Sequence, residues 1–342
     1  MKLTRRGRIV LLLGAFVLTL LVGFNLFMHS IGVYGESAPA SDRVTIDIPE
    51  GTGTAEIGDL LTREGVIKSS LGWRIAVFLH SGNELIQAGT YQLATGLTAP
   101  DALDALLERP PKEEFTRVTF PEGSWLTDFA AALDSDTHID GDAFLELATS
   151  GKVRSKYQPD GIETLEGLLF PSTYEVIERD SARTVLNRLV EEFEKQAAGL
   201  DFARVESTGV SAYEAITIAS MIEAEAELDE ERPMIARVIY NRLQEGMQLG
   251  IDATILYALG EHKTTLSSED LAIDSPYNTR EVTGLPPTPI GAPGVKSLEA
   301  ALNPADGEWL YYVLADCEGH HAFSETYEEF LENKAAYQAL TC

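Results

Sequence analysis

The stretch AITIASMIEAEAELDEERPMIARVIYNRLQ (residues 215–244) predicts two amphipathic helices joined by about five residues. Glu223 and Glu225 fall on opposite shoulders of the first helix's apolar stripe when residues are spaced 100° apart. The members of that stripe are Ala215, Ile218, Ala219, Ile222 and Ala226, with Ile216 at its edge. Periodicity alone does not choose between the two carboxylates, and a solvated rim residue is the ordinary interpretation of either.

The second helix predicts where such a carboxylate would lie. Asp229 suits its N-cap, Pro233 suits its first turn, and Gly246 suits its end. Two amphipathic helices with so short a connection pack antiparallel or at a steep angle, which places a shoulder carboxylate in the groove between them. Partial desolvation there raises the pKa of a glutamate, and a neutral carboxylic acid is the group that protonates a glycosidic oxygen.

The N-terminus predicts a membrane anchor. Four basic residues precede an apolar run at 9–28. About 20 apolar residues with a rise of 1.5 Å each cross a hydrocarbon core of about 30 Å. A secretory signal peptide shares the pattern but has an apolar region of only about 7–15 residues. We therefore expect residues 1–34 to form an uncleaved single-pass anchor in the cytoplasmic (inner) membrane, with the basic flank inside and the rest outside.

Net charge and the positions of the cysteines and histidines limit the partners and metal sites that the sequence allows. The 342 residues carry a formal net charge of −28, which argues against nucleic acid as a partner. Cys317 and Cys342 fit either a disulfide that pins the tail or two free thiols. The six histidines and two cysteines form no cluster at ligand spacing, so the sequence predicts no metal site.

Composition divides the exterior into segments. Residues 35–42 (GESAPASD) read as a linker, and 108–114 (ERPPKEE) as a domain boundary. The segments 43–61 and 117–133 each predict a strand, a Pro-Glu-Gly turn and a helix. Residues 275–294 hold five prolines and three glycines, which excludes regular structure. Long ordered loops of this kind tend to carry function.

Several long motifs in the chain resemble those of one known family. They are IASMIEAEA, ARVIYNRLQEGMQLGIDATILYALG, SPYNTREVTGLPPTPIGAPGVKSLEAALNPA, GHHAFSETYEE and the upstream LEGLLFPSTYEV. Together they resemble the YceG-like family of endolytic murein transglycosylases. The resemblance implies an α+β protein with three parts: one N-terminal transmembrane helix, a small LysM-like α/β subdomain at 43–110, and a mixed, largely helical catalytic domain at 115–342.

The resemblance also implies a reaction and a catalytic residue. In that family the first glutamate of the ASxxExE helix is the acid/base, which maps onto Glu223. The reaction would cleave the β-1,4 bond between N-acetylmuramic acid and N-acetylglucosamine within a glycan strand. Glu223 would protonate the leaving oxygen and then take the proton of the muramic acid 6-hydroxyl, which attacks its own anomeric carbon and leaves a 1,6-anhydro end. The implied reaction needs no cofactor or metal.

Three other carboxylates have competing interpretations. Glu166 would line the same cleft or serve a turn beside Gly167. Glu225 would tune Glu223 or face solvent. Asp252 would cap a short helix or provide the second carboxylate that a hydrolase needs.

The remaining supporting residues are polar or aromatic. Asn241 would bond an acetamido group of the sugar or an adjacent carbonyl. Tyr277, Asn278 and Thr279 would form a substrate wall or, for the last two, a turn. His321 would contact the glycan or make a structural hydrogen bond.

Two rival functions remain open at this stage. One is a muramidase-type hydrolase, which would leave reducing ends. The other is a non-catalytic wall-binding scaffold, whose effects would survive Glu223→Gln. As partners, the resemblance implies glycan strands of peptidoglycan and the peptidoglycan synthases of the division or elongation machinery, near which the enzyme would end strand growth. The LysM-like region would bind glycan or act as a spacer. Its sequence lacks a strong exposed aromatic platform, for which Trp73 and Tyr91 are the only obvious candidates.

Overall fold

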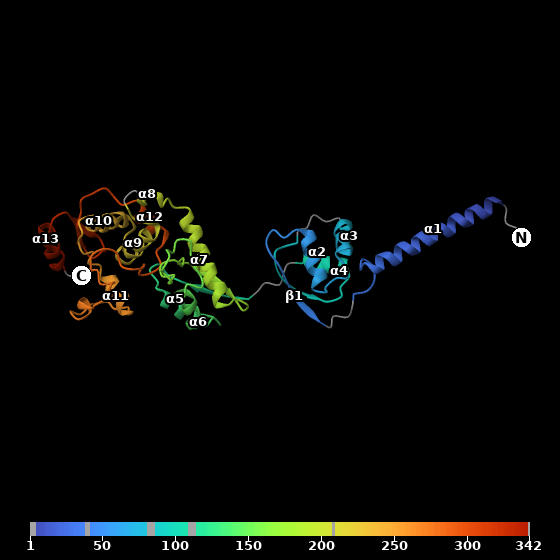
Figure 1. Cartoon of the computed structure of the whole chain (residues 1–342), viewed down its shortest axis with the longest axis horizontal. Coiled ribbons are helices and arrows are strands. Elements are labelled where there is room, and N and C mark those ends of the chain that lie inside the picture. Colours follow the sequence, from blue (N-terminus) through green and yellow to red (C-terminus); the bar gives the residue numbers. More distant parts are fainter. Residues whose placement is uncertain (1–4, 38–41, 81–85, 109–113, 207–208, 341–342) are drawn as a thin grey trace. The chain divides into compact units, whose positions relative to one another are not determined.

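The computed structural model describes residues 5–37, 42–80, 86–108, 114–206 and 209–340. The chain divides into two compact units, Met1–Glu113 and Glu114–Cys342, each with its own hydrophobic core. Helices and short antiparallel strands occur in both (Figure 1), so the structure is mixed α+β. Most of the predicted linker at 35–42 and most of the predicted boundary at 108–114 lie outside the described residues.

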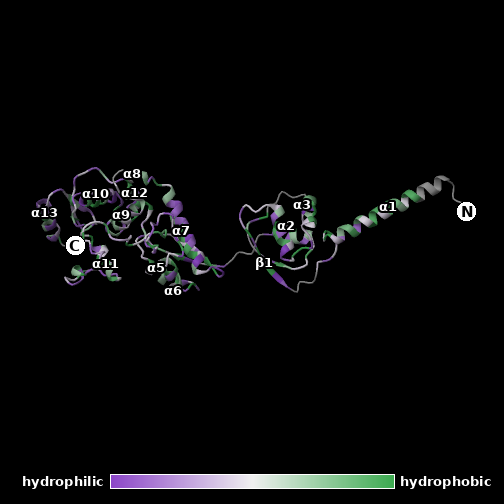
Figure 2. Cartoon of the chain, viewed as in Figure 1, coloured by the Kyte–Doolittle hydropathy of each residue, from purple (hydrophilic) through white to green (hydrophobic). Residues whose placement is uncertain are grey.

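The first unit begins with one long apolar helix. Helix α1 spans Arg5–Ser30, and its part Leu12–Ser30 is long and apolar enough to cross a membrane. Much of this helix is coloured as hydrophobic in Figure 2. Its leucine, valine and phenylalanine side chains are exposed, which is unfavourable for a helix that faces water. This helix is compatible with the predicted anchor.

The rest of the first unit is a β–α–α–β arrangement followed by one helix. The elements are β1 (Arg43–Ile48), α2 (Thr54–Arg63), α3 (Ser70–Leu79), β2 (Gly89–Ala94) and α4 (Ala99–Leu107). Strands β1 and β2 pair antiparallel along their whole length. Trp73 and Tyr91 are 0% and 2% exposed and belong to the core. Neither candidate therefore offers an exposed platform for a sugar.

The second unit is mostly helical. It contains β3 (Phe115–Thr119), α5 (Leu126–Asp136), α6 (Gly141–Thr149), β4 (Thr173–Ile177), α7 (Ala182–Ala198), α8 (Ala203–Glu206), α9 (Ala212–Glu225), η1 (Asp229–Glu231), α10 (Arg232–Gln244), α11 (Asp252–Leu259), η2 (Asp270–Ala272), α12 (Val295–Leu302), β5 (Tyr311–Leu314), β6 (His321–Ser324) and α13 (Tyr327–Gln338). Among the described residues its strands pair as two antiparallel ribbons, β3 with β4 and β5 with β6.

Helix α9 is the central element of the second unit. Ser211 caps its start in a reciprocal capping box with Glu214. Every residue from Ala215 to Ile222 is buried, so this part of the helix is buried on all sides rather than along one stripe. Helices α8, α10, α11 and α12 pack against it. The last turn of α9 carries Glu223 and Glu225, which have polar partners.

Candidate active site

The two carboxylates occupy the least favourable end of α9 for negative charge. Glu223 and Glu225 lie in its last turn, where unpaired carbonyl groups give the helix dipole its negative pole. A carboxylate there needs donors from elsewhere in the fold. Each glutamate has such donors, and the two sets differ.

Glu223 is enclosed in an ion pair. The Arg232 guanidinium donates to its Oε1 at 3.0 Å, and the Gly294 backbone N–H donates to its Oε2 at 2.9 Å. The two charged side chains are 6% and 9% exposed. Arg232 also donates to Asp229 at 3.2 Å and to the Ser297 hydroxyl. Each oxygen of Glu223 thus accepts one donor of the protein itself, and further acceptor sites remain on the carboxylate.

A third carboxylate, Glu122, lies beside this pair and was not singled out from the sequence. A β-carbon built on Gly294 would fall 1.9 Å from Glu122 Oε1, so this carboxylate rests against the glycine whose N–H binds Glu223. Backbone hydrogen bonds Gly123 N–H to Ala292 O and Ala292 N–H to Ser124 O join the two loops. Partial burial, and then the negative charge of Glu223, raise the pKa of Glu122. The sequence predicted the Pro-Glu-Gly turn that holds Glu122, but not that this turn lies beside Glu223 and Gly294.

Glu225 has a different environment. The Tyr312 hydroxyl donates to its Oε2 at 2.8 Å. Burial is the main cause that raises the pKa of Glu225, and the negative charge of Asp252 adds to it. Burial also raises the pKa of Tyr312, which keeps that hydroxyl protonated as a donor. Burial therefore favours the neutral form of Glu225.

Glu225 also lines a cleft of about 470 Å³. The cleft lies among α9, α10, α11, the β5–β6 ribbon and α13. Its lining residues are Glu225, Arg242, Leu249, Gly250, Asp252, Arg280, Tyr311, Tyr312, Tyr327, Phe330 and Lys334. Titratable groups and aromatic rings therefore converge there, which is the usual character of a ligand site.

Asp252 faces this cleft but does not cap its helix. Ile251 occupies the N-cap of α11, and Asp252 is the first helical residue. The Arg280 guanidinium binds the Asp252 carboxylate, with Nε and Nη2 each 2.7 Å from Oδ1. The capping interpretation is therefore wrong, whereas a second carboxylate near Glu225 is present.

Glu166 is buried in a separate set of contacts, with 4% of its surface exposed. It accepts the Leu126 N–H, at the start of α5, at 3.3 Å and the Tyr257 hydroxyl, on α11, at 3.1 Å. Burial is the main cause that raises the pKa of Glu166 to about 7. Its bonds join α5 to α11 and do not serve the turn beside Gly167 alone.

The three amide and hydroxyl side chains predicted near the substrate are used inside the protein. The Asn241 amide donates to the carbonyls of Gly307 and Trp309, at 3.2 and 2.9 Å. Asn278 and Thr279 are both 0% exposed, so they cannot form a substrate wall. Asn278 donates to the carbonyls of Leu271 and Ile273, and Thr279 bonds Thr254 and Ile251.

Tyr277 and His321 also have partners within the fold. The Tyr277 hydroxyl lies 2.8 Å from Thr288 Oγ1, and its ring centroid lies 5.0 Å from that of Tyr257. His321 pairs with Glu231 through its backbone N–H and its Nδ1, both at 2.7 Å. The two side chains of that pair are 8% and 5% exposed, so the contact of His321 is structural.

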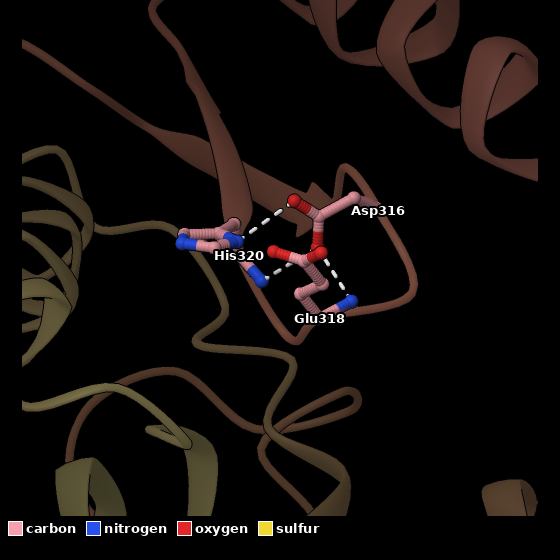
Figure 3. Close-up of side chains that lie close together, drawn as sticks. All are labelled: Asp316, Glu318 and His320. Carbon is pink, nitrogen blue, oxygen red and sulfur yellow. Dashed lines mark hydrogen bonds and ion pairs between the residues drawn. The ribbon is translucent and has the colours of Figure 1, made fainter.

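One three-donor cluster appears on the turn between β5 and β6. Asp316, Glu318 and His320 offer ligand atoms within 4.8 Å of one another (Figure 3). However, Asp316 accepts the backbone N–H groups of Glu318 and His320 and contacts the His320 ring at 2.7 Å. These bonds explain the cluster as turn chemistry. Cys317 in this turn is disulfide-bonded, and Cys342 lies outside the described residues.

Comparison with known proteins identifies the relatives of this chain. The model of the YceG-like family matches residues 46–336. The endolytic murein transglycosylase of Bacillus subtilis (strain 168) is 34% identical over 308 residues, which cover 86% of this chain and 84% of the relative. The protein of the same name from Streptococcus pneumoniae (strain R6) is 29% identical, and the match covers 94% of this chain and 65% of the relative.

A solved structure is similar as well. The crystal structure of a putative yceG-like protein from Listeria monocytogenes superposes with a TM-score of 0.58 at 30% identity. The match covers 86% of this chain and 99% of that one. The predicted enzyme class, a lytic transglycosylase that acts on peptidoglycan, agrees with the names of the curated relatives. The family predicted from the motifs is confirmed: this chain belongs to the YceG-like family.

Proposed function

We propose that the chain is an endolytic lytic transglycosylase that cleaves the β-1,4 bond between N-acetylmuramic acid and N-acetylglucosamine within glycan strands. The relatives named murein transglycosylases support the substrate class. The observation that carries the mechanism is the position of Glu225, in a cleft of about 470 Å³ and in surroundings that raise its pKa.

Glu225 is the acid/base of this proposal. As a neutral acid it donates its proton to the oxygen of the leaving N-acetylglucosamine, and the bond from that oxygen to C1 breaks. As a carboxylate it then takes the proton of the muramic acid 6-hydroxyl, whose oxygen bonds to C1. The net reaction consumes no water and leaves a 1,6-anhydro end. One carboxylate suffices because the nucleophile belongs to the substrate.

Glu223, to which the family pattern assigns this role, is the alternative acid/base of the proposal. A general acid needs an oxygen that can reach the leaving group. Arg232 and Gly294 each bind one oxygen of Glu223, and its side chain is 6% exposed, so as the acid it would exchange one of these partners for the leaving group. We assign Glu223 to holding the last turn of α9 against α10 and the loop before α12. In that position it fixes the geometry of Glu225 two residues later.

Mass spectrometry of digested glycan strands tests this assignment. Detergent-solubilised full-length protein should produce internal fragments with 1,6-anhydromuramic ends, and Glu225→Gln should produce none. Glu223→Gln, at a temperature where circular dichroism shows it folded, should retain measurable cleavage. Loss of cleavage in folded Glu223→Gln together with normal cleavage by Glu225→Gln would return the acid/base role to Glu223.

Hydrolysis is a second candidate because Asp252 lines the same cleft as Glu225. A hydrolase uses a second carboxylate as nucleophile or to activate water. Its ion pair with Arg280, which also lines the cleft, holds the Asp252 carboxylate there. Fragments with reducing ends in the same assay would favour this reaction, and Asp252→Asn should then abolish it.

The finer predictions about the setting of the enzyme belong to the same proposal. We propose that α1 is a single-pass anchor in the cytoplasmic membrane, with the basic N-terminus inside and the second unit outside. Anchoring would confine cleavage to nascent strands beside peptidoglycan synthases and so end their elongation. The β–α–α–β arrangement of the first unit supports a LysM-like module, and burial of its aromatic residues favours the spacer role. Protease protection of the N-terminal flank in sealed vesicles tests the orientation.

A further inference from the structure

One side of the Glu225 cleft is aromatic. Tyr311 on β5 meets Tyr327 and Phe330 on α13, with ring centroids 5.7 and 5.5 Å away, and those two rings lie 5.8 Å apart. All three residues line the cleft. Tyr327 is 58% exposed. This aromatic wall (Tyr311, Tyr327 and Phe330) therefore faces the space into which Glu225 opens.

These rings pack α13 against β5, yet they leave the helix exposed to solvent. Over its described residues 327–338, none is buried. Contact of an apolar ring face with water is unfavourable. A cluster of rings at a cleft is therefore the kind of surface that a bound ligand covers. A sugar ring suits it, because aromatic rings offer a flat apolar face and the tyrosine hydroxyls remain free to hydrogen-bond.

Three cations line the cleft, and Lys334 differs from the two arginines in its partners. Arg242 donates to the carbonyls of Leu310 and Leu249, and Arg280 is bound to Asp252. Lys334 lies 5.8 Å from the centroid of the Phe330 ring, and no ion pair joins it to a carboxylate within the part of the chain that the structure describes. A chain with a net charge of −28 repels anions overall, so a local unpaired ammonium at the cleft favours an anionic substituent.

We propose that the aromatic wall is a saccharide subsite of the cleft, in which Lys334 pairs with an anionic substituent of the bound sugar. The inference rests on the proposed function and deepens it, because it names the substrate unit beside the reacting bond as a sugar that carries an acidic group, such as the peptide-bearing muramic acid. The rings of the wall stack on the sugar, and Lys334 selects for its anionic substituent.

Binding measurements separate the two contributions. The probes are purified uncross-linked glycan strands with their peptides, which are anionic, and an N-acetylglucosamine hexamer, which is neutral. Full-length protein is used in detergent, in whichever glutamate-to-glutamine variant the cleavage assay shows to be inactive. Tyr327→Leu should weaken binding of both probes about tenfold. Lys334→Gln should weaken the strands several-fold, leave the hexamer unchanged, and reduce the salt dependence of strand binding.

Leu331→Ala is the matched control. Leu331 lies on the same helix, is 45% exposed and does not line the cleft, so its truncation should change neither affinity by more than twofold. Phe330→Ala provides a second test of the wall if Tyr327→Leu does not fold. Wild-type affinity in both wall variants would overturn the subsite, as would an equal loss in Leu331→Ala. A wild-type protein that binds strands and cuts none would instead refute the proposed function and leave the subsite standing.

Discussion

Removal of Arg232 should be the most costly single change near the two glutamates. Arg232→Met leaves Glu223, with a side chain 6% exposed, to the Gly294 N–H alone and to the negative end of the α9 dipole. Breaking a buried pair from one side costs about 3–5 kcal/mol. In a unit the size of Glu114–Cys342, each kcal/mol lowers Tm by about 2–4 °C, so Tm should fall by at least about 6 °C.

The two partners of this pair should not be equivalent. Glu223→Gln leaves Arg232 bound to Asp229 and Ser297, so its cost should be smaller, about 1–3 kcal/mol. The double variant should cost less than the sum of the two single variants, because neither charge then remains unpaired. Thermal unfolding of detergent-solubilised full-length protein, followed by circular dichroism, measures all three.

A surface pair provides the control. Arg117 and Glu175 also form an ion pair, at 3.1 Å, but their side chains are 66% and 52% exposed. Arg117→Met should therefore change stability by less than about 1 kcal/mol. The argument from burial would be refuted if Arg232→Met unfolded within 2 °C (about 1 kcal/mol) of the wild type, or if both arginine variants lost the same amount.

Two further changes test the fold. Glu166 has a pKa of about 7 when folded, raised by burial from its usual 4.5. Its stabilising contribution is complete below about pH 4.5 and is lost as pH rises through 7, by about 3 kcal/mol. Denaturant unfolding at pH 5 and 8 should show a smaller pH dependence in Glu166→Gln, and an unchanged slope would contradict the assignment. Gly167→Ala combines a φ of +73° with a β-carbon 2.2 Å from Pro289 Cβ, and should cost more than 2 kcal/mol. Gly246→Ala, with a φ of +66° and open space, should show only the conformational part, and equal losses would refute the clash.

The sequence predicted local features better than contacts between distant segments. The strand–turn–helix segments expected at 43–61 and 117–133 are β1 with α2 and β3 with α5, and the paired helices at 215–244 are α9 and α10. The predicted stripe underestimated how much of α9 is buried. Periodicity identifies one apolar face, whereas alanine, serine and threonine residues are buried on the other faces as well. Short motifs with their own turn chemistry could be read directly from residue order.

The environment of each glutamate could not be read in this way. Tyr312 lies 87 residues from Glu225, and Gly294 lies 71 residues from Glu223. Which shoulder of α9 meets the cleft is decided by these distant partners. The same holds for Asn278 and Thr279, whose residue types suit a sugar but whose donors are used by neighbouring segments of the fold. Residue type indicates what a side chain can bond, and packing decides what it does bond.

The contrast between α9 and α13 has a consequence for how substrate preference can change. Glu225 is carried by a helix enclosed by the core, whereas the aromatic wall and Lys334 are carried largely by a helix with no buried residue at 327–338. Substitutions in α9 disturb packing in every direction, so the reacting group has little room to drift. Substitutions on α13 leave the core intact. Substitutions in α13 can therefore change which glycan unit is recognised, while α9 and its reacting group stay the same.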